Sequence, residues 1–239
     1  QTENGNSASP SKQQLSNLLK LYQNGQFSDA EKLAVLITQD FPEHQFAWKV
    51  LGAVLKQTGR VTDSLTAMQK SVKLASQDAE AHNNLGVTLK ELGTLDKAEE
   101  SLRKSIALKS DYVEAHNNLG VTLKELGRLD EAEASLRQAI ALKPDYAEAH
   151  SNLGVTLKEL GRFDEALDSY NQAIVLKPNF AEAYVNLSNA IKNVKFNSSN
   201  SKFYPLLSQL LNAGNFTRPR DVARSILSLL KQDTQIKDL

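Results

Sequence analysis

The sequence contains 239 residues, of which 41% are hydrophobic, so it can bury a large core. Its 28 lysines and arginines balance its 28 aspartates and glutamates, which argues against nucleic acid or an anionic membrane as a partner. Cysteine is absent, which excludes a disulfide framework and a thiolate zinc site. No apolar run is long enough to span a bilayer, and residues 1–12 lack the apolar core of a secretory signal, so we favour a cytoplasmic location.

A repeating pattern follows a polar leader at residues 1–10, which we expect to be disordered. Residues 11–44 and 45–78 are divergent copies of a 34-residue unit, and residues 79–112, 113–146 and 147–180 are nearly identical copies that share the string LGVTLKELG. Residues 181–194 match the first half of the unit only. This period predicts one helix-turn-helix per copy, stacked into an all-α, right-handed α-α superhelix, because a single unit cannot bury its apolar face alone.

The register of the repeats is lost in residues 195–239. Beyond a polar loop, Phe203–Leu211 and Pro219–Lys231 have amphipathic spacing, and Pro219 suits a first helical turn. We expect these two extra helices to cap the C-terminal end of the stack. Because the sequence stops at Leu239 without a clear terminus signal, we also expect the natural protein to be longer.

Recurrent glycines predict where the two helices of each copy meet and where the first one ends. Positions are numbered from 1 in each copy, starting at residues 11, 45, 79, 113, 147 and 181. Glycine at position 8 costs roughly 1 kcal/mol relative to alanine inside a helix, so a second helix should pack closely against it. Glycine at position 15 should end the first helix in the left-handed conformation. The glycines at position 8 are Gly52, Gly86, Gly120 and Gly154. The glycines at position 15 are Gly25, Gly59, Gly93, Gly127 and Gly161.

The second helix of each copy has its own start and stop signals. Position 18 is serine, threonine or aspartate, so we expect it to be the N-cap, with capping boxes completed by the glutamates at position 21. Position 32 is proline in three copies, and we expect it to end the helix. The residues concerned are Glu31, Glu99 and Glu133, and Pro42, Pro144 and Pro178.

These columns together resemble the tetratricopeptide repeat, over roughly residues 11–195. That family has a large residue at position 4, Leu-Gly at positions 7 and 8, alanine at positions 20 and 27, an aromatic residue at position 24 and proline at position 32. This sequence departs from the pattern at position 11, where leucine replaces an aromatic residue. The resemblance implies that the first helix of each copy lines a concave face and that the chain binds other proteins.

Four successive predicted first helices carry an asparagine at position 6. We call Asn84, Asn118, Asn152 and Asn186 the asparagine column. A primary amide has donors and an acceptor, so it can pair with the main-chain N–H and C=O of an extended segment whatever the side chains are. Helices about 8–10 Å apart would match about three residues of such a segment per copy. The column resembles the asparagines in the superhelical domain of O-linked N-acetylglucosamine transferases, which hold protein substrates by their main chain.

Two further columns complete the predicted peptide-binding set. Position 5 adds Asn83 and Asn117, and position 12 adds Lys90, Lys124 and Lys158. Two alternatives stay open. In one, the asparagines are consensus residues copied by duplication and solvated. In the other, the lysines belong to a lattice of solvated ion pairs with the glutamates at positions 2 and 13, worth little per pair.

Two other kinds of site are not expected. A clamp for a C-terminal carboxylate would need Asn, Lys and Arg at places that Ala53, Glu114 and Asn118 hold. The histidines at position 4 cannot share a metal ion, because zinc ligands lie ~2.0–2.1 Å from the ion whereas successive copies stand about 8–10 Å apart. We expect His82, His116 and His150 to pack against the preceding helix.

No catalytic constellation is evident, because the sequence has no glycine-rich phosphate loop and no nucleophile paired with a histidine. We therefore predict a non-catalytic interaction module, without cofactor or metal, that binds an extended protein segment in a concave groove. Two other hypotheses remain: a structural scaffold that self-assembles into homo-oligomers through its groove or terminal helices, and the substrate-recruitment arm of a larger transferase-type enzyme. Nucleic acid and membrane are not predicted partners.

Overall fold

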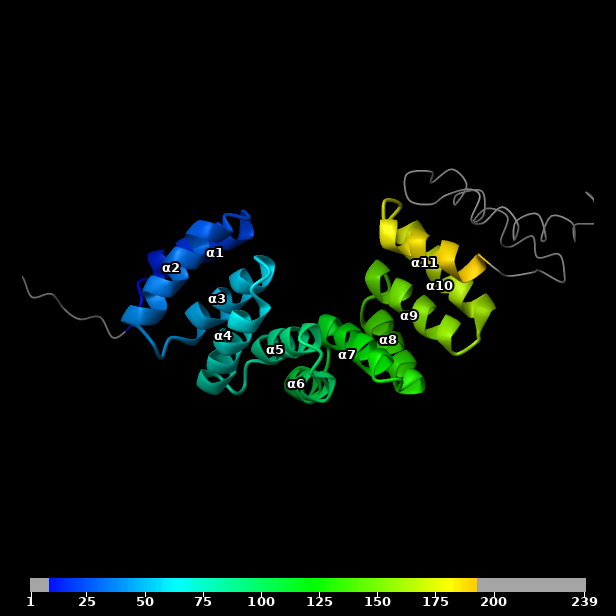
Figure 1. Ribbon diagram of the computed structural model, residues 1–239, viewed down its shortest axis with the longest axis horizontal. Coiled ribbons are helices and arrows are strands. Elements are labelled where there is room, and N and C mark those ends of the chain that lie inside the picture. The colour runs from blue at the N-terminus through cyan, green and yellow to red at the C-terminus, as the bar shows by residue number, and fades with distance from the viewer. Residues whose placement is uncertain (1–8, 193–239) are drawn as a thin grey trace, which may run out of the picture. The chain divides into compact units, whose positions relative to one another are not determined.

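The computed structural model describes residues 9–192, and the regular secondary structure within them is entirely α-helical (Figure 1). The helices are α1 (Lys12–Gln23), α2 (Phe27–Asp40), α3 (Gln45–Gln57), α4 (Val61–Leu74), α5 (Ala79–Glu91), α6 (Leu95–Leu108), α7 (Val113–Glu125), α8 (Leu129–Leu142), α9 (Ala147–Glu159), α10 (Phe163–Leu176) and α11 (Ala181–Ile191). Each full copy of the repeat thus contains two helices, which confirms the all-α fold class. The C-terminal helices expected at 203–211 and 219–231, and residues 1–8 of the leader, lie outside the described residues.

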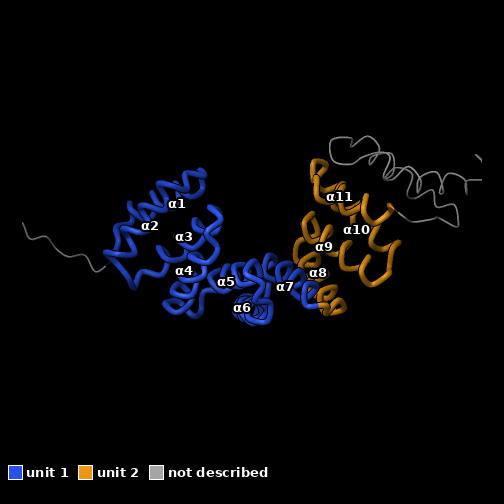
Figure 2. Tube along the Cα trace, in the orientation of Figure 1, with its two compact units in different colours: residues 1–126 blue, residues 127–239 orange. Residues whose placement is uncertain are grey.

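The chain divides into two units, residues 1–126 and residues 127–239 (Figure 2). In the first unit, the pairs α1–α2, α3–α4 and α5–α6 stack in chain order, and α7 packs on α6. The first helices of successive pairs also touch, α1 with α3, α3 with α5 and α5 with α7. In the second unit, α9 packs on α8 and α10, and α11 packs on α9 and α10. Within each unit, this is the stacking of an α-α superhelix.

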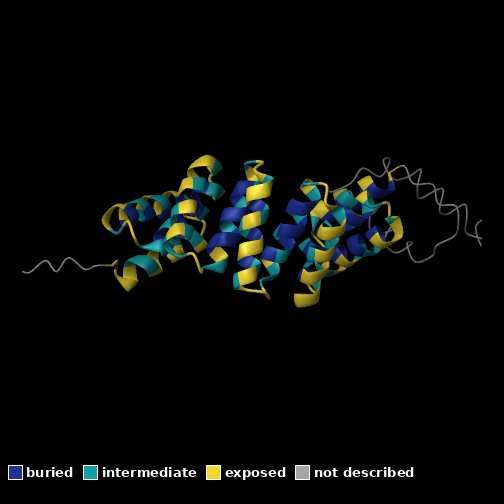
Figure 3. Ribbon diagram, turned by 90° about the horizontal axis from the view of Figure 1, so that it is seen from below, coloured by how far each residue is buried: buried dark blue, intermediate teal, exposed yellow. Residues whose placement is uncertain are grey.

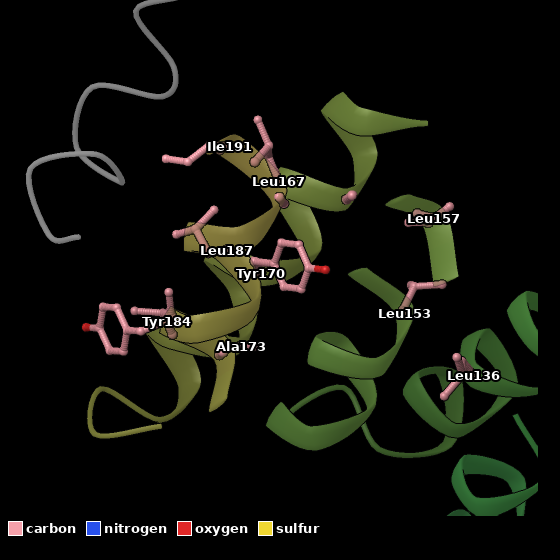
Figure 4. Close-up of a cluster of buried hydrophobic side chains, with 13 residues drawn as sticks. Leu136, Leu153, Leu157, Leu167, Tyr170, Ala173, Tyr184, Leu187 and Ile191 are labelled. Atoms are coloured by element: carbon pink, nitrogen blue, oxygen red, sulfur yellow. The ribbon is translucent and has the colours of Figure 1, made fainter. Parts of the chain in front are cut away.

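The two helices of a copy meet closely at position 8. A Cβ atom added to Gly86 on α5 would lie 2.6 Å from Cγ of Leu102 on α6. In the second unit, a Cβ atom added to Gly154 on α9 would lie 2.6 Å from the ring of Tyr170 on α10. Figure 4 shows Tyr170 within the core cluster of that unit, close to Leu153. These contacts leave no room for a side chain and explain the recurrent glycine, as the sequence predicted.

The glycines at position 15 turn the chain between the two helices of each copy. Their φ angles run from 71° at Gly25 to 79° at Gly59, which is the region that only glycine adopts cheaply. At the other end of the unit, α2 ends at Asp40 just before Pro42, and α8 ends at Leu142 just before Pro144. Both the glycine turn and the proline stop are therefore confirmed.

The expected N-caps of the second helices are wrong by two residues. Helix α6 begins at Leu95, so its N-cap is position 16, and no side-chain capping bond forms there in α2, α4, α6, α8 or α10. The left-handed glycine at position 15 already redirects the chain, so the second helix can start two residues later. Its first bond runs from the N–H of Ala98 to the carbonyl of Thr94, at 3.0 Å. Position 18 therefore lies in the first turn, where the negative charge of aspartate interacts favourably with the positive end of the helix dipole. The glutamates of position 21 make no capping box, and Glu133 instead lies 2.6 Å from the guanidinium of Arg162.

The core of each unit lies between its helices, and buried and exposed residues alternate along individual helices (Figure 3). Leucines and small alanines make up most of this core, and the small alanines let neighbouring helices approach closely. In the first unit the buried residues include Leu18, Ala30, Val54, Met68, Leu89, Ala98 and Leu102, and in the second Leu136, Leu157, Ala166, Tyr170 and Leu187. With these columns fixed by packing, the remaining columns of the first helices are left to form a surface.

Candidate peptide-binding site

The structure places the two asparagine positions at different depths in the first unit. At position 5, Asn83 on α5 and Asn117 on α7 are buried, with 5% and 6% of their surface exposed. At position 6, Asn84 and Asn118 are half-buried and reach solvent. A dissolved peptide would therefore meet the position 6 amides, whereas the position 5 amides lie beneath the surface.

One buried amide, Asn83, holds two of the half-exposed ones in place. Nδ2 of Asn118 donates to Oδ1 of Asn83 at 2.9 Å, which links α7 to α5. Nδ2 of Asn83 in turn lies 3.4 Å from Oδ1 of Asn84, a longer and weaker bond. Among residues 9–192, Oδ1 of Asn118 and Nδ2 of Asn84 have no hydrogen-bond partner in the structure. The arrangement thus leaves an acceptor and a donor available at neighbouring first helices. Sequence reasoning grouped positions 5 and 6 together and missed this division of roles.

The second unit repeats the pattern with a hydroxyl in place of the buried amide. Ser151 at position 5 of α9 is 1% exposed, and its Oγ lies 3.4 Å from Nδ2 of Asn186 on α11. Asn152 and Asn186 at position 6 are half-buried. Serine is shorter than asparagine, so the bond to the next copy is longer than in the first unit. The asparagine column therefore has a buried polar partner at position 5 in each unit.

The lysines at position 12 take part in ion pairs along the first helices of the first unit. Nζ of Lys56 lies 3.3 Å from a carboxylate oxygen of Glu91, and Nζ of Lys90 lies 3.8 Å from one of Glu125. Both glutamates stand at position 13 of the following copy. The lattice of ion pairs that the sequence allowed as an alternative is thus present at Lys90, so this lysine is only partly available to a ligand. Lys124 and Lys158 are half-buried.

A second network of charges joins α3 to α5. Nζ of Lys49 lies 3.1 Å from Asp78 and 2.8 Å from Glu80. Burial would lower the pKa of Lys49, but the hydrogen bonds to Glu80 and Asp78 outweigh it and raise this pKa. Burial likewise would raise the pKa of Asp78, but the bonds from the N–H of Ala81 and from Lys49 leave it below the usual value of 3.8. Both groups are therefore charged at neutral pH.

A pocket of about 420 Å³ opens beside this network, among α1, α3 and α5, with Met68 of α4 also in its wall. Asn84 forms part of its wall, together with apolar and aromatic side chains from the two divergent copies. The sequence prediction missed this pocket because it followed the columns that are alike in every copy. The signal that marks it is the departure of residues 11–78 from those columns.

The ring nitrogens at position 4 contact the chain that precedes the first helix. Nε1 of Trp48 donates to the carbonyl of Pro42 at 2.8 Å. Nε2 of His116 lies 2.9 Å from the carbonyl of Ser110, and His82 and His150 make the same contact at 3.1 and 2.9 Å. The histidines thus have a structural role at the junction of copies. The described residues contain no group of three histidine, aspartate or glutamate side chains placed to hold a metal ion.

Comparison with known proteins agrees with this geometry. Two tetratricopeptide repeat models match the sequence, one over residues 77–145 and 111–177 and the other over residues 19–79. No curated protein matches it at a significant level. None of the helices within residues 9–192 has the length and apolar character needed to cross a membrane.

Several solved structures share the fold. YrrB, described as a TPR protein with an unusual peptide-binding site, has a TM-score of 0.61 and 21% identity, over 76% of this chain and 92% of that one. A thermophilic TPR protein from Thermus thermophilus has a TM-score of 0.62 and 26% identity, over 75% and 97%. MamA has a TM-score of 0.60 and 24% identity, over 68% and 95%.

Proposed function

This chain belongs to the tetratricopeptide repeat family, a family of protein-interaction modules, and we propose that it acts without catalysis by binding an extended polypeptide segment through its asparagine column. The observation that carries the proposal is the state of the position 6 amides. All four are half-buried, three of them (Asn84, Asn118 and Asn186) are oriented by a buried side chain at position 5, and Asn84 and Asn118 keep polar atoms without a protein partner.

Preorganisation gives such amides an advantage in binding. An asparagine held by a neighbouring side chain loses little conformational entropy when a ligand arrives, so more of the hydrogen-bond energy contributes to affinity. An extended segment presents one N–H and one C=O per residue, and these are the groups that an amide can accept from and donate to. Recognition of this kind depends on the main chain, so it tolerates many side chains.

The charges near the column are consistent with a ligand of low net charge. The lysines at position 12 are offset by the glutamates at position 13, as in the pairs Lys56–Glu91 and Lys90–Glu125. No excess of one sign is present in the sequence as a whole. We therefore expect binding to depend weakly on salt, in contrast to a groove that selects acidic or basic peptides.

The test compares amides in the groove with an amide on another face. Peptides that the protein selects from a random library are measured against Asn84→Ala, Asn118→Ala and the double variant. Each single loss should weaken binding a few-fold and the double loss about tenfold, since the two neutral hydrogen bonds are worth about 1–2 kcal/mol together. Gln69→Ala, an exposed amide on α4, serves as the control and should bind like the unmodified protein.

Two further readouts keep this test decisive. Circular dichroism should show unchanged helicity for all variants, because Asn84 and Asn118 are not core residues. Light scattering at rising concentration should show a monomer, whereas growth into larger species would favour the self-assembling scaffold. If the protein selects no peptide, or if the double variant binds as tightly as the control, the asparagine column is not a binding site.

A further inference from the structure

The pocket among α1, α3 and α5 differs in chemistry from the asparagine column beside it. Six of the eleven residues that line it are apolar or aromatic, the other five are polar or charged, and its volume is about 420 Å³. The apolar side chains that line it are Leu19, Tyr22, Phe46, Val50, Ala53 and Met68. We call this site the apolar pocket. It lies entirely within the first unit, and Leu19 is 38% exposed at its edge.

The apolar pocket exists because the divergent copies change columns that are polar in the later ones. Position 2 is Phe46 here and glutamate in the next four copies, and position 6 is Val50 here and asparagine in the same four. Position 12 is Tyr22 in the first copy and lysine in the later ones. Position 9 is Ala53 where the following three copies have valine, so space is left open. Four differences in one groove thus place apolar side chains and a hollow where the later copies present a polar surface.

The charges at the pocket's rim are already paired within the protein. Lys49 is bound to Asp78 and Glu80, and Lys56 to Glu91. A charged ligand group entering the pocket would lose its hydration and find no unpaired charge of opposite sign, which is unfavourable. An uncharged, apolar group would lose nothing and would remove apolar surface from water.

The pocket is continuous with the asparagine column, because Asn84 belongs to its wall. An extended segment advances about 3.3 Å per residue. A segment whose peptide group pairs with Asn84 would therefore hold a side chain one or two residues away at the mouth of the pocket. When a segment binds in this way, the asparagine column holds its main chain and the apolar pocket receives one of its side chains.

We propose that the first unit selects extended segments of other proteins that carry one bulky, uncharged apolar side chain, such as leucine, methionine or phenylalanine, as an anchor in the apolar pocket. This inference rests on the proposed function and adds a side-chain preference to it. The charged side chains around the pocket are already paired with one another, which argues for the uncharged anchor, and its continuity with Asn84 argues for a peptide as the occupant.

The test uses the full chain and a random peptide library. The selected peptides should share a bulky apolar residue at one position, and replacing that residue with alanine should weaken binding roughly ten- to hundredfold. Two variants give the pocket the residues of the later copies: Ala53→Val narrows it, and Phe46→Glu places a charge in its wall. Each should reduce the preference for the anchor at least fivefold. Because neighbouring copies tolerate these residues, folding should persist, and circular dichroism melting checks it.

The outcomes separate this inference from the proposed function. Peptides that bind with no shared apolar residue, yet bind more weakly to Asn84→Ala, would overturn the apolar anchor and leave the proposed function standing. An anchor preference unchanged in both pocket variants would also overturn it, as would selection of a charged anchor. Concentration-dependent self-association that Ala53→Val abolishes would show that a second copy of the chain occupies the pocket, and would overturn it too.

Discussion

The copies at residues 45–78 and 79–112 stand side by side in the first unit and make the same helix pair from different sequences. Both have glycine at positions 8 and 15 and alanine or serine at the helix contact, and both pairs pack alike. Their surfaces differ, because residues 45–78 have Phe46 and Val50 at the positions where residues 79–112 have Glu80 and Asn84. The comparison teaches that packing columns set the fold and that the remaining columns of the first helix are free to set the ligand.

The same comparison shows that one packing column can be filled in different ways. The partner of Gly52 at position 8 is Met68, whose Cε would lie 2.8 Å from an added Cβ. The partner of Gly86 is Leu102, with the carbonyl of Ala98 also only 3.2 Å away. Methionine is long and adaptable, whereas leucine is branched and stiffer. The glycine column should therefore be unequally sensitive to substitution.

The largest effect is expected at this column. Gly86→Ala should lower the free energy of unfolding by about 1–2 kcal/mol, because overpacking costs about 1–3 kcal/mol and alanine returns up to about 1 kcal/mol in helix propensity. Gly52→Ala, its matched control, should change stability by less than about 0.5 kcal/mol, since the end of Met68 can move aside. Urea denaturation followed by circular dichroism measures both. Equal losses at the two sites would show that the partner at position 24 does not matter.

A smaller effect is expected where the two copies join. Asp78 caps α5 by accepting from the N–H of Ala81 and also binds Lys49, whereas the next junction has Tyr112 with Nζ of Lys109 5.0 Å from its ring centre. Asp78→Asn keeps a capping oxygen but removes the charge, so it should cost about 1 kcal/mol at neutral pH after allowance for solvent screening.

The pH dependence of that junction follows from the lowered pKa of Asp78. A carboxyl whose pKa is depressed in the folded state contributes stability above its unfolded value, here about 3.8, and loses it as the pH falls through the folded value. The unmodified protein should thus be more stable than Asp78→Asn at pH 7. The stabilities of the two proteins should converge as the pH falls below the folded pKa of Asp78. Melting temperatures at pH 7, 5 and 3 would test this, and a constant difference between the proteins across all three would contradict it.

The smallest effect is expected in the second unit and has the opposite sign. Tyr170 fills position 24 there, is fully buried, and has a hydroxyl without a hydrogen-bond partner in the structure. Burial raises the pKa of this hydroxyl, and Glu159 adds to the effect, so it stays neutral. Tyr170→Phe should raise the free energy of unfolding by about 0.5–1 kcal/mol, because it removes an unpaired polar group and keeps the ring. A loss of stability on thermal melting would mean that the hydroxyl has a partner.

Much of the fold could be predicted because its signals are local. A left-handed glycine, a proline stop and a glycine in a tight contact each restrict one residue, and Gly25, Pro42 and Gly86 behave as expected. The N-cap prediction failed because residues such as Asp96 suit both the cap and the first helical turn. Which of the two it occupies depends on where the preceding glycine directs the chain.

The candidate site was less predictable because burial decides its roles. Asn83 and Asn84 are identical neighbours in the sequence, yet one lies beneath the surface and the other reaches solvent. The pairing of Asn118 with Asn83 joins residues 35 positions apart, and it follows from the stacking of α5 and α7. The apolar pocket was overlooked for a related reason, since it needs α1, α3 and α5 together.

Asn84, Asn118 and their counterparts are proposed to bind the main chain of a peptide. The most direct measurement takes the tightest-binding library peptide and replaces its amide bonds one at a time by esters, which removes single N–H donors and leaves the side chains intact. The ester that removes the N–H facing Oδ1 of Asn118 should weaken binding about fivefold, since one neutral hydrogen bond is worth about 1 kcal/mol, and should have much less effect in the Asn84→Ala, Asn118→Ala double variant. If every ester analogue binds like the parent peptide, recognition does not run through the main chain and the account is wrong.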